Sequence, residues 1–332
     1  MDEHVRHAVQ VPATTANLGP GYDAFGAAVD LHLLVATAPR ADGPRVSARG
    51  EGAVELSDGE DNLVWTSLLA ACERFGWQVP DVDLVVDNPI PLARGLGSSS
   101  AAIVAGIALA RALAGADAGL VRRDHAVGDV DLVDLAADLE GHPDNVAPAL
   151  HGGMVAAATT DDGRRVVRTL PPPVTSRPLL LVPEQRQVTS EARAVLPEQL
   201  PRADVAEQAA RAGHVLAGMA GLWPVDPDLA GDRLHEPTRL AVMAASGALV
   251  TALRAHGHHA WLSGAGPTVA VALPAGDAEA SAARVAELPE ALGFRALLHS
   301  WDRQGVRACA DGGCAVAGLA GGCSDCPLAR LA

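Results

Sequence analysis

A stretch of glycines and serines in the first third of the chain could bind an anion. It runs from Asn88 to Ala102, and the apolar run 101–110 that follows it predicts a buried helix. A glycine-rich turn leading into a helix exposes unpaired backbone N–H groups at the positive end of the helix dipole, the usual setting of a phosphate site. The serine hydroxyls add donors and could reach a metal ion on the phosphates.

This stretch differs from the common phosphate loop because no lysine follows the glycines, and the chain contains no lysine at all. That excludes a P-loop lysine, a kinase β3 lysine and a Schiff-base lysine. The alternative interpretation is an ordinary Gly/Ser turn before a core helix, which a bare Gly-x-Gly would favour.

Two further polar segments carry side chains suited to a small zwitterionic ligand. Asn17 and Asp23 lie in a segment expected to be a loop between strands, where a carboxylate suits an ammonium group and an amide can orient a hydroxyl. Arg193 follows an expected helix start at Thr189, and a guanidinium can hold a carboxylate with two parallel hydrogen bonds. The alternatives are a self-satisfied turn for the first segment and an exposed arginine for the second.

A third polar segment, residues 140–145, follows an expected helix over 131–139. It reads Glu-Gly-His-Pro-Asp-Asn, an unusual density of polar groups between a helix end and a proline turn. Helix capping with Gly141 just past the helix end would also explain part of it. A carboxylate such as Glu140 suits a hard cation bridging phosphate oxygens.

Taken together, these motifs resemble the GHMP small-molecule kinases and, within them, the homoserine kinase family. The matching patterns are Val-Pro-Ala-Thr-x-Ala-Asn-Leu-Gly-Pro-Gly-[Phe/Tyr]-Asp at 11–23, Pro-x-x-x-Gly-Leu-Gly-Ser-Ser-Ser-Ala at 91–101, Glu-Gly-His-Pro-Asp-Asn at 140–145, Thr-x-x-Ala-Arg-x-x-Leu-Pro at 189–197, Asp-Arg-Leu-His-[Gln/Glu]-x-x-Arg at 232–239 and a third glycine motif at 263–268. They occur in family order over about residues 9–306.

The resemblance implies an α+β fold of two domains. The N-terminal ATP-binding domain, similar to domain 2 of ribosomal protein S5, would cover residues 1–160, and a ferredoxin-like C-terminal domain residues 161–306, with a cysteine-containing tail at 307–332. The implied activity is ATP-dependent phosphorylation of the L-homoserine side-chain hydroxyl to O-phospho-L-homoserine, a step of threonine biosynthesis, with ATP and Mg²⁺ as cofactors. A homodimer is also implied.

The resemblance assigns nucleotide-binding and metal-binding residues by motif position. Nucleotide contacts fall on Asn62, Pro91, Leu92, Ala93, Arg94, Gly95, Leu96, Gly97, Ser98, Ser99, Ser100, Ala101, Gly264 and Gly266. Mg²⁺ would be held by Glu140 with Ser98 or Ser99.

The acceptor site and the catalytic residues are implied in the same way. Arg193 and Arg239 would hold the substrate carboxylate, Asp23 its ammonium group, and Asn17 with Asn145 its hydroxyl. The two remaining assignments are His142 beside the acceptor and Thr189 near the γ-phosphate. Some relatives use an Asp–Lys pair as base, which a chain without lysine excludes. Asp23 as base stays open, with the phosphate itself as the alternative proton acceptor.

Two alternative functions stay open. The segment 240–245 lacks the proline found in relatives, which permits another small hydroxylated amino acid, such as threonine, as the acceptor. A non-catalytic ligand sensor on the same fold should have lost Glu140 or the loop serines, and both are present.

Composition narrows the class of protein. The formal charge is −15 over 332 residues, which argues against nucleic acid and against an anionic membrane surface as partners. The sequence has no run of 18 apolar residues, so we expect no membrane-spanning helix. We do not expect the acidic start of the chain to be a signal peptide. We therefore expect a cytoplasmic protein that acts on a small molecule.

Four of the five cysteines lie in the last 24 residues, at Cys309, Cys314, Cys323 and Cys326. Four thiols can bind zinc, but the first spacing is not that of a standard zinc knuckle. A small zinc or thiol-redox appendage and a poorly ordered tail are the two interpretations, and the Ala/Gly-rich composition favours the second.

Overall fold

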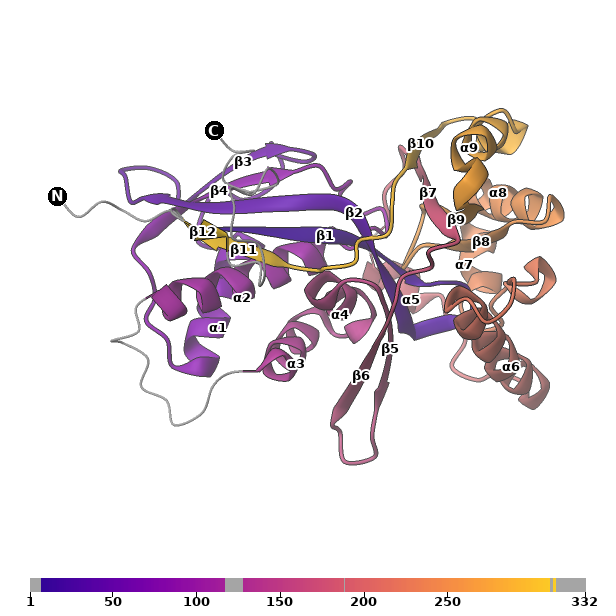
Figure 1. Cartoon of the computed structure of the whole chain (residues 1–332), viewed down its shortest axis with the longest axis horizontal. Coiled ribbons are helices and arrows are strands. Elements are labelled where there is room, and N and C mark those ends of the chain that lie inside the picture. The colour runs from indigo at the N-terminus through magenta and orange to yellow at the C-terminus, as the bar shows by residue number, and fades with distance from the viewer. Residues whose placement is uncertain (1–6, 117–127, 188, 311–312, 315–332) are drawn as a thin grey trace.

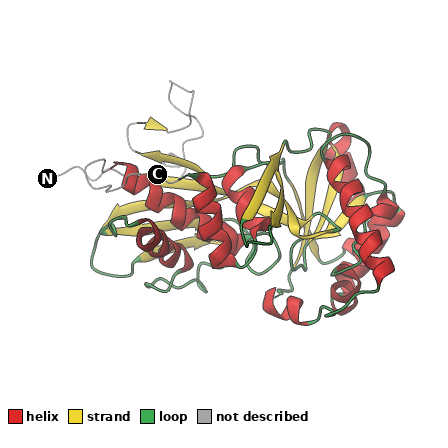
Figure 2. Ribbon diagram, turned by 90° about the horizontal axis from the view of Figure 1, so that it is seen from below, coloured by secondary structure: helices red, strands yellow, loops and turns green. Residues whose placement is uncertain are grey.

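The structure is a computed structural model that describes residues 7–116, 128–187, 189–310 and 313–314. The chain forms two bodies side by side, each a sheet with helices on one side (Figures 1 and 2). Strands β1 and β2 reach from the first body to the second, so the turn between them lies where the two bodies meet (Figure 1).

The first body is built on an eight-stranded sheet with the order β12-β11-β1-β2-β4-β3, and a β5–β6 hairpin pairs with the start of β2. Its strands are β1 His7–Asn17, β2 Gly21–Pro39, β3 Val46–Gly50, β4 Val82–Asn88, β5 Met154–Thr159, β6 Arg165–Leu170, β11 Arg307–Ala310 and β12 Gly313–Cys314. The helices beside it are α1 Leu63–Phe75, α2 Ser98–Ala116, α3 Asp129–Glu140 and α4 Pro143–His151.

The second body carries a four-stranded antiparallel sheet with the order β10-β7-β9-β8. Its strands are β7 Ser176–Pro183, β8 His259–Leu262, β9 Val269–Pro274 and β10 Phe294–Leu298. Its helices are α5 Thr189–Ala194, α6 Arg202–Met219, α7 Glu236–Val242, α8 Ala244–Ala255 and α9 Ala278–Ala286. Helices α8 and α9 pack on this sheet and close a second apolar core around Leu179, Leu249 and Val271.

Two local predictions in the first 26 residues were wrong. The proline at position 12 predicts the end of the first strand, but β1 continues to Asn17: its pairing with β2 shifts register between Pro12 and Ala13, an irregularity at which a proline is tolerated. The expected loop is a β-hairpin, with a tight turn over 18–20 in which Leu18 and Gly19 have positive φ, as does Asn17 just before it. The small residues there serve a turn and close strand packing rather than a long loop.

The helices predicted over 101–110, over 131–139 and from Thr189 are confirmed in α2, α3 and α5, whereas α4 and α7 were not predicted. Asn62 caps α1 by accepting from the Val64 N–H at 3.0 Å, and Gly76 ends that helix with φ +68°. The polar run after Glu140 does contain the expected left-handed Gly141, but a second helix, α4, begins at Pro143, where a proline fits the first helical turn. The two helices meet at a corner that holds Gly141 and His142.

The predicted domain boundary at residue 160 falls in the turn of the β5–β6 hairpin, and both strands of that hairpin belong to the first sheet. The chain then crosses to the second sheet, and β11 returns to pair with β1. The predicted tail therefore begins as a strand, in which Cys309 is buried, and Cys314 lies in β12. Cys323 and Cys326 lie outside the described residues.

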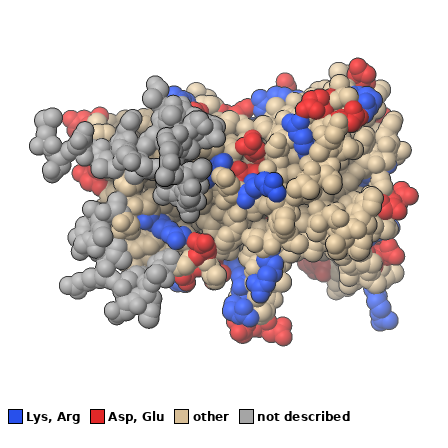
Figure 3. All heavy atoms as spheres, in the orientation of Figure 1, with Lys and Arg blue, Asp and Glu red and all other residues tan. Residues whose placement is uncertain are grey.

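Two features of the described residues bear on the expected partners. On the face shown in Figure 3, arginines and acidic residues are interspersed rather than gathered into one basic face. By length and composition α2 alone among the described helices could span a membrane, but 56% of its stretch Ser98–Gly115 is buried inside the protein. Its apolar composition is thus that of a core helix, packed against α1 and β1.

Candidate active site

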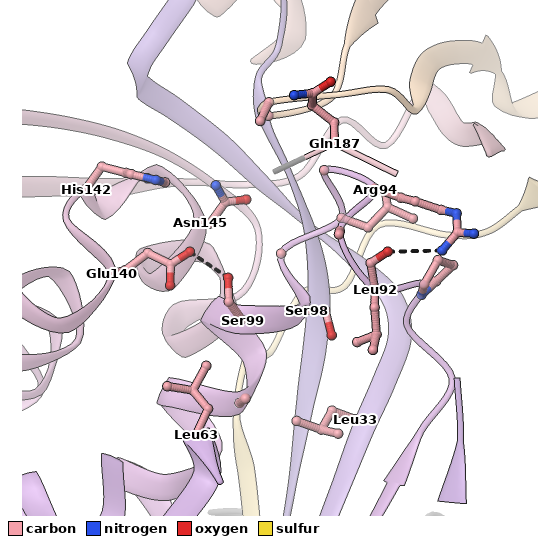
Figure 4. Close-up of a pocket in the computed structure, with 18 of the residues that line it drawn as sticks. Leu33, Leu63, Leu92, Arg94, Ser98, Ser99, Glu140, His142, Asn145 and Gln187 are labelled. Carbon is pink, nitrogen blue, oxygen red and sulfur yellow. Dashed lines mark hydrogen bonds between the residues drawn. The ribbon is translucent and has the colours of Figure 1, made fainter. Parts of the chain in front are cut away.

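A cavity of about 560 Å³ lies where the two bodies meet, and most of the predicted site residues line it. Its apolar lining residues include Leu33, Leu56, Leu63, Val64, Val86 and Leu92, of which Leu33 and Leu63 lie toward one end in Figure 4. Its polar lining residues include Asn17, Asp23, Glu140, His142, Asp144, Asn145, Arg193 and Arg239, of which His142 and Asn145 lie toward the other end. The Gly/Ser loop runs between the two ends (Figure 4), so one cavity can hold an apolar ring, a chain of anionic groups and a polar acceptor in that order.

The Gly/Ser loop has the backbone of an anion site. Ala93, Gly95 and Gly97 have φ of +53°, +73° and +66°, and left-handed residues at alternate positions are typical of loops whose N–H groups surround an anion. The loop ends at Ser98, the first residue of the 19-residue helix α2, whose dipole adds positive potential there.

Close packing holds this loop in place. A Cβ on Gly95 would lie 2.1 Å from the Ser263 carbonyl oxygen, and one on Gly97 would lie 2.0 Å from Thr14 Oγ1. The Ser263 hydroxyl donates to the Gly95 carbonyl at 2.6 Å, which joins the loop to the third glycine motif of the second body. Glycine is therefore required at both positions for contact as well as for conformation.

Arg94 ties the loop to the second body from its outer side. Its Nε donates to the Pro183 carbonyl at 2.9 Å and its Nη2 to the Glu184 carbonyl at 2.8 Å. Beside it, the Gln187 N–H donates to the Ala93 carbonyl at 2.8 Å. These donors are used to anchor the loop, so the anion-binding capacity of the loop rests on its backbone amides.

Glu140 lies over the first turn of α2. The hydroxyls of Ser99 and Ser100 both donate to its Oε1 at 2.8 Å, and Figure 4 shows the bond from Ser99, whereas Ser98 lies toward Leu92. Carboxylate and hydroxyl oxygens are the ligands that Mg²⁺ prefers. A set of hard oxygen donors at the positive end of a helix, beside an anion loop, therefore fits a Mg²⁺–phosphate group.

At the acceptor end, Asp23 and Arg193 form a bidentate ion pair. Arg193 Nη2 lies 2.7 Å from Asp23 Oδ1 and Nη1 lies 2.9 Å from Oδ2, with both side chains about one-third exposed. The hydrogen bonds that Arg193 donates to Asp23 raise the pKa of Arg193. Arg193 also donates to the Tyr22 hydroxyl at 2.8 Å. Asp23, predicted to bind the substrate ammonium group, and Arg193, predicted to bind the substrate carboxylate, therefore pair with each other in this structure.

Arg239 reaches the same end from α7 and is almost fully buried, at 2% exposure. Its Nε donates to the Ala192 carbonyl at 3.0 Å, and its Nη1 contacts the Gly264 carbonyl at 3.2 Å and His235 Nδ1 at 3.3 Å. Within the described part of the chain no carboxylate pairs with it, and burial lowers its pKa. A buried guanidinium held only by neutral acceptors has an unmet demand for an anion.

Amide and imidazole groups complete the polar end. Asn17 Nδ2 donates to the Gly264 carbonyl at 2.8 Å, and Asn145 Oδ1 accepts from Thr14 Oγ1 at 2.8 Å. His142 Nδ1 makes a short hydrogen bond with the buried Asp144. Burial lowers the pKa of His142, but that hydrogen bond and the charges of Asp144 and Asp23 outweigh it, so the pKa lies above its ordinary value.

A few predicted residues do not line the cavity. Ser100, Ala101 and Gly266 are buried behind its wall, although the Ser100 hydroxyl still reaches Glu140. Asn62 does line it, but both ends of its amide are used, on the Val64 N–H and the Ser57 carbonyl. The backbone of Thr189 begins α5, and its side chain lies outside what the structure describes.

Several lining or supporting residues were not assigned a role from the sequence. Thr14, Tyr22 and Asp144 lie inside the matched motifs, so their positions were visible but their roles were not. Nothing in the sequence assigned the apolar lining residues Leu33, Leu56 and Val86 to a site, because apolar side chains in strands and turns are usually expected to belong to the hydrophobic core. Only the assembled fold brings them to one end of the cavity.

Comparisons with known proteins agree with this geometry. Residues 62–153 match the family described as GHMP kinases N terminal domain. The chain is 40% identical over 280 residues to a homoserine kinase of Streptomyces avermitilis, which covers 84% of this chain and 88% of that one. It is 41% identical to a homoserine kinase of a Synechococcus strain, over 80% and 85% of the two chains.

Among solved structures, a homoserine kinase from Cytophaga hutchinsonii superimposes with a TM-score of 0.77 at 25% identity. The superposition covers 93% of this chain and 99% of that one. The superposition extends over both bodies, and it confirms the predicted α+β architecture.

Proposed function

We propose a role in the reaction for each group of residues that lines the cavity, since the chain belongs to the homoserine kinases of the GHMP kinase family. These enzymes transfer the γ-phosphoryl group of ATP to the side-chain hydroxyl of L-homoserine. The product, O-phospho-L-homoserine, belongs to threonine biosynthesis. A cytoplasmic location stays a prediction from the composition of the sequence, and a homodimer stays a prediction of the family resemblance.

The nucleotide takes the apolar end and the Gly/Ser loop. The adenine ring lies among the leucines and valines of that end, and the backbone N–H groups of residues 93–97 with the start of α2 hold the phosphates. Phosphoryl transfer needs positioning and charge neutralisation more than a strong base. A rigid loop of backbone donors supplies both without a lysine.

Glu140 and the hydroxyls beside it hold Mg²⁺. Ser99 is the hydroxyl best placed for this role, since it shares Glu140 Oε1 with Ser100 and lines the cavity. A Mg²⁺ ion held there would neutralise part of the charge of the phosphates. Glu140 also keeps the serine hydroxyls turned toward the phosphate end of the cavity.

The acceptor is recognised as a zwitterion, and the observation that carries this proposal is the charge pattern at the polar end. Asp23 offers a carboxylate for the substrate ammonium, and Arg193 offers a guanidinium for the substrate carboxylate. Arg239, buried without a carboxylate partner in the described residues, supplies the second cation. An α-amino acid carries its two charges one carbon atom apart. It would therefore bind between Asp23 and Arg193 once these two side chains separate.

Asn17, Asn145 and His142 orient the hydroxyl toward the phosphates. Each is already fixed by a partner, namely the Gly264 carbonyl, Thr14 Oγ1 and Asp144. We assign the Asp23 carboxylate to the substrate ammonium group, and therefore to binding rather than to the role of the base. As the hydroxyl oxygen bonds to the γ-phosphorus, the bond from that phosphorus to the bridging oxygen breaks and ADP leaves, and the hydroxyl proton passes to an oxygen of the transferred phosphoryl group.

An assay of ADP release with Mg·ATP and a panel of acceptors tests the function. We expect turnover with L-homoserine well above that with L-threonine, L-serine, mevalonate or galactose. Turnover with another acceptor alone would keep the nucleotide site and overturn the proposed acceptor site. ATP binding without any turnover would favour the ligand-sensor alternative.

A further inference from the structure

His235 links the carboxylate site to the β1–β2 turn. It lies just before α7, is fully buried, and its ring contacts Arg239 Nη1 through Nδ1 at 3.3 Å and the Gly19 carbonyl through Nε2 at 3.3 Å. A guanidinium can only donate and a carbonyl can only accept. The two partners therefore fix the tautomer: Nδ1 accepts from Arg239, and Nε2–H donates to Gly19.

This link makes Arg239 and the turn one unit. The turn carries Asn17 on one side and Asp23 on the other, both of which line the cavity. The Tyr22 ring packs against His235 with a centroid distance of 5.3 Å, and the guanidinium of Arg239 lies 5.4 Å from the same ring. An imidazole between a ring, a guanidinium and a carbonyl has little freedom to move.

We propose that His235 is a positioning residue for substrate recognition, which orients the Arg239 guanidinium toward the acceptor carboxylate and holds it in register with the turn that binds the ammonium group. The inference rests on the proposed homoserine kinase reaction. His235 does not line the cavity, so it acts through Arg239 and not by touching the acceptor.

The chain offers a matched control in His259. This histidine is also buried and donates through Nε2 to the neighbouring carbonyl of the same turn, that of Leu18, at 3.0 Å. Its Nδ1, however, contacts no hydrogen-bonding group among the described residues. His259 thus shares the turn-holding contact of His235 and lacks the contact with Arg239.

Two substitutions at His235 separate its two bonds. In His235→Gln the side-chain amide can reach Gly19 in place of Nε2 but presents no acceptor at the Nδ1 position. In His235→Asn the shorter amide keeps an acceptor near Arg239 and loses the donor to Gly19. A role confined to folding would not distinguish acceptors that differ only in their carboxylate.

The experiment compares kcat/KM for L-homoserine with that for L-homoserinamide, in which a neutral amide replaces the carboxylate. We expect His235→Gln to lower the ratio of the two about tenfold, since a hydrogen bond to a charged group is lost. His235→Asn and His259→Gln should keep the wild-type ratio, even where their melting temperatures fall.

The other possible results would contradict either the positioning role of His235 or the proposed acceptor site. An equal loss with both acceptors in His235→Gln, or the same fall of the ratio in His259→Gln, would reduce His235 to a structural residue. Should His235→Gln not fold, His235→Leu, which removes both bonds, takes its place: a lowered ratio would support the proposal and a wild-type ratio would overturn it. A wild-type enzyme with no preference for the carboxylate would instead contradict the proposed acceptor site itself.

Discussion

The two ends of the cavity are built in different ways. The nucleotide end relies on one continuous loop, residues 91–99, whose backbone is shaped by glycines and packed without space for a Cβ at Gly95 or Gly97. The acceptor end is assembled from side chains on the β1–β2 hairpin, α4, α5 and α7, joined by hydrogen bonds and one ion pair. The first end should be sensitive to added atoms, and the second to lost polar groups.

Removal of Glu140 should have the largest effect on turnover. Glu140→Ala takes away the carboxylate that two serine hydroxyls share and that we assign to Mg²⁺. We expect kcat to fall roughly 10²–10³-fold, as for other lost electrostatic contacts to a transferring group, with little change in KM for homoserine. Assays of ADP release over a Mg²⁺ titration measure both.

Asp138→Asn is the matched control for Glu140, because it removes a carboxylate from the same helix that pairs with Arg165 at 2.7 Å outside the cavity. Its kinetics should stay near those of the wild type. Unchanged phosphorylation by Glu140→Ala would remove this residue from the mechanism.

A methyl group at Gly97 tests whether the two ends are independent. The new Cβ would meet Thr14 Oγ1 at 2.0 Å in a residue with φ +66°, and Thr14 holds Asn145 of the acceptor end. We expect Gly97→Ala to lower the free energy of unfolding by about 3 kcal/mol, from strain and overpacking together. It should also raise KM for both substrates.

Gly163→Ala separates strain from crowding. Gly163 has φ +82° and no atom within 4 Å of its ideal Cβ, so only the conformational cost, about 1 kcal/mol, should remain. Urea denaturation of both variants measures the difference. Equal losses would mean that crowding at Gly97 contributes nothing.

Arg239→Lys should affect the acceptor end alone. Lysine keeps the charge but not the fork that makes parallel hydrogen bonds with a carboxylate. We expect KM for homoserine to rise about 30-fold, with KM for ATP unchanged. Arg94→Lys, which loosens the anchored loop, should do the reverse and raise KM for ATP. Equal changes in both constants for either variant would contradict the division of the cavity.

The same contrast explains what the sequence could predict. The Gly/Ser loop and α2 follow from contiguous residues, since a glycine turn before an apolar helix dictates an exposed helix start. The pairing of Asp23 with Arg193 joins residues 170 positions apart, and no local pattern encodes it. Family resemblance named both residues, but it could not show that they contact each other.

Local propensity also misled where tertiary packing decides. Pro12 reads as a strand end, yet the register shift beside it lets β1 continue to Asn17. The run after Glu140 reads as a turn, yet Pro143 begins a helix whose Asp144 and Asn145 point to the site. The role of His235 was out of reach for the same reason, since its partners Gly19 and Arg239 come from two separate elements.

The smallest effect we predict is a pH dependence of stability that arises behind the acceptor end. Burial lowers the pKa of His259 to about 4 in the folded protein, while in the unfolded chain it should titrate near its ordinary value of 6.5. Above that value the ring is neutral in both states, and His259 adds no pH dependence. As the pH falls below 6.5, His259 binds a proton in the unfolded chain but stays neutral in the folded protein. The free energy of unfolding therefore declines toward pH 4.

His259→Gln isolates this contribution, because glutamine keeps an N–H donor for the Leu18 carbonyl and does not titrate. Between about pH 7.5 and 5.5 the wild type should lose about 1 kcal/mol more than the variant, as urea denaturation at each pH would show. Parallel losses would mean that His259 is protonated in the folded state or solvated there. A difference that grows as the pH falls from about 7.5 to 5.5 would show that the turn of the acceptor end is held by a neutral imidazole, a constraint that the backbone-built nucleotide end does not share.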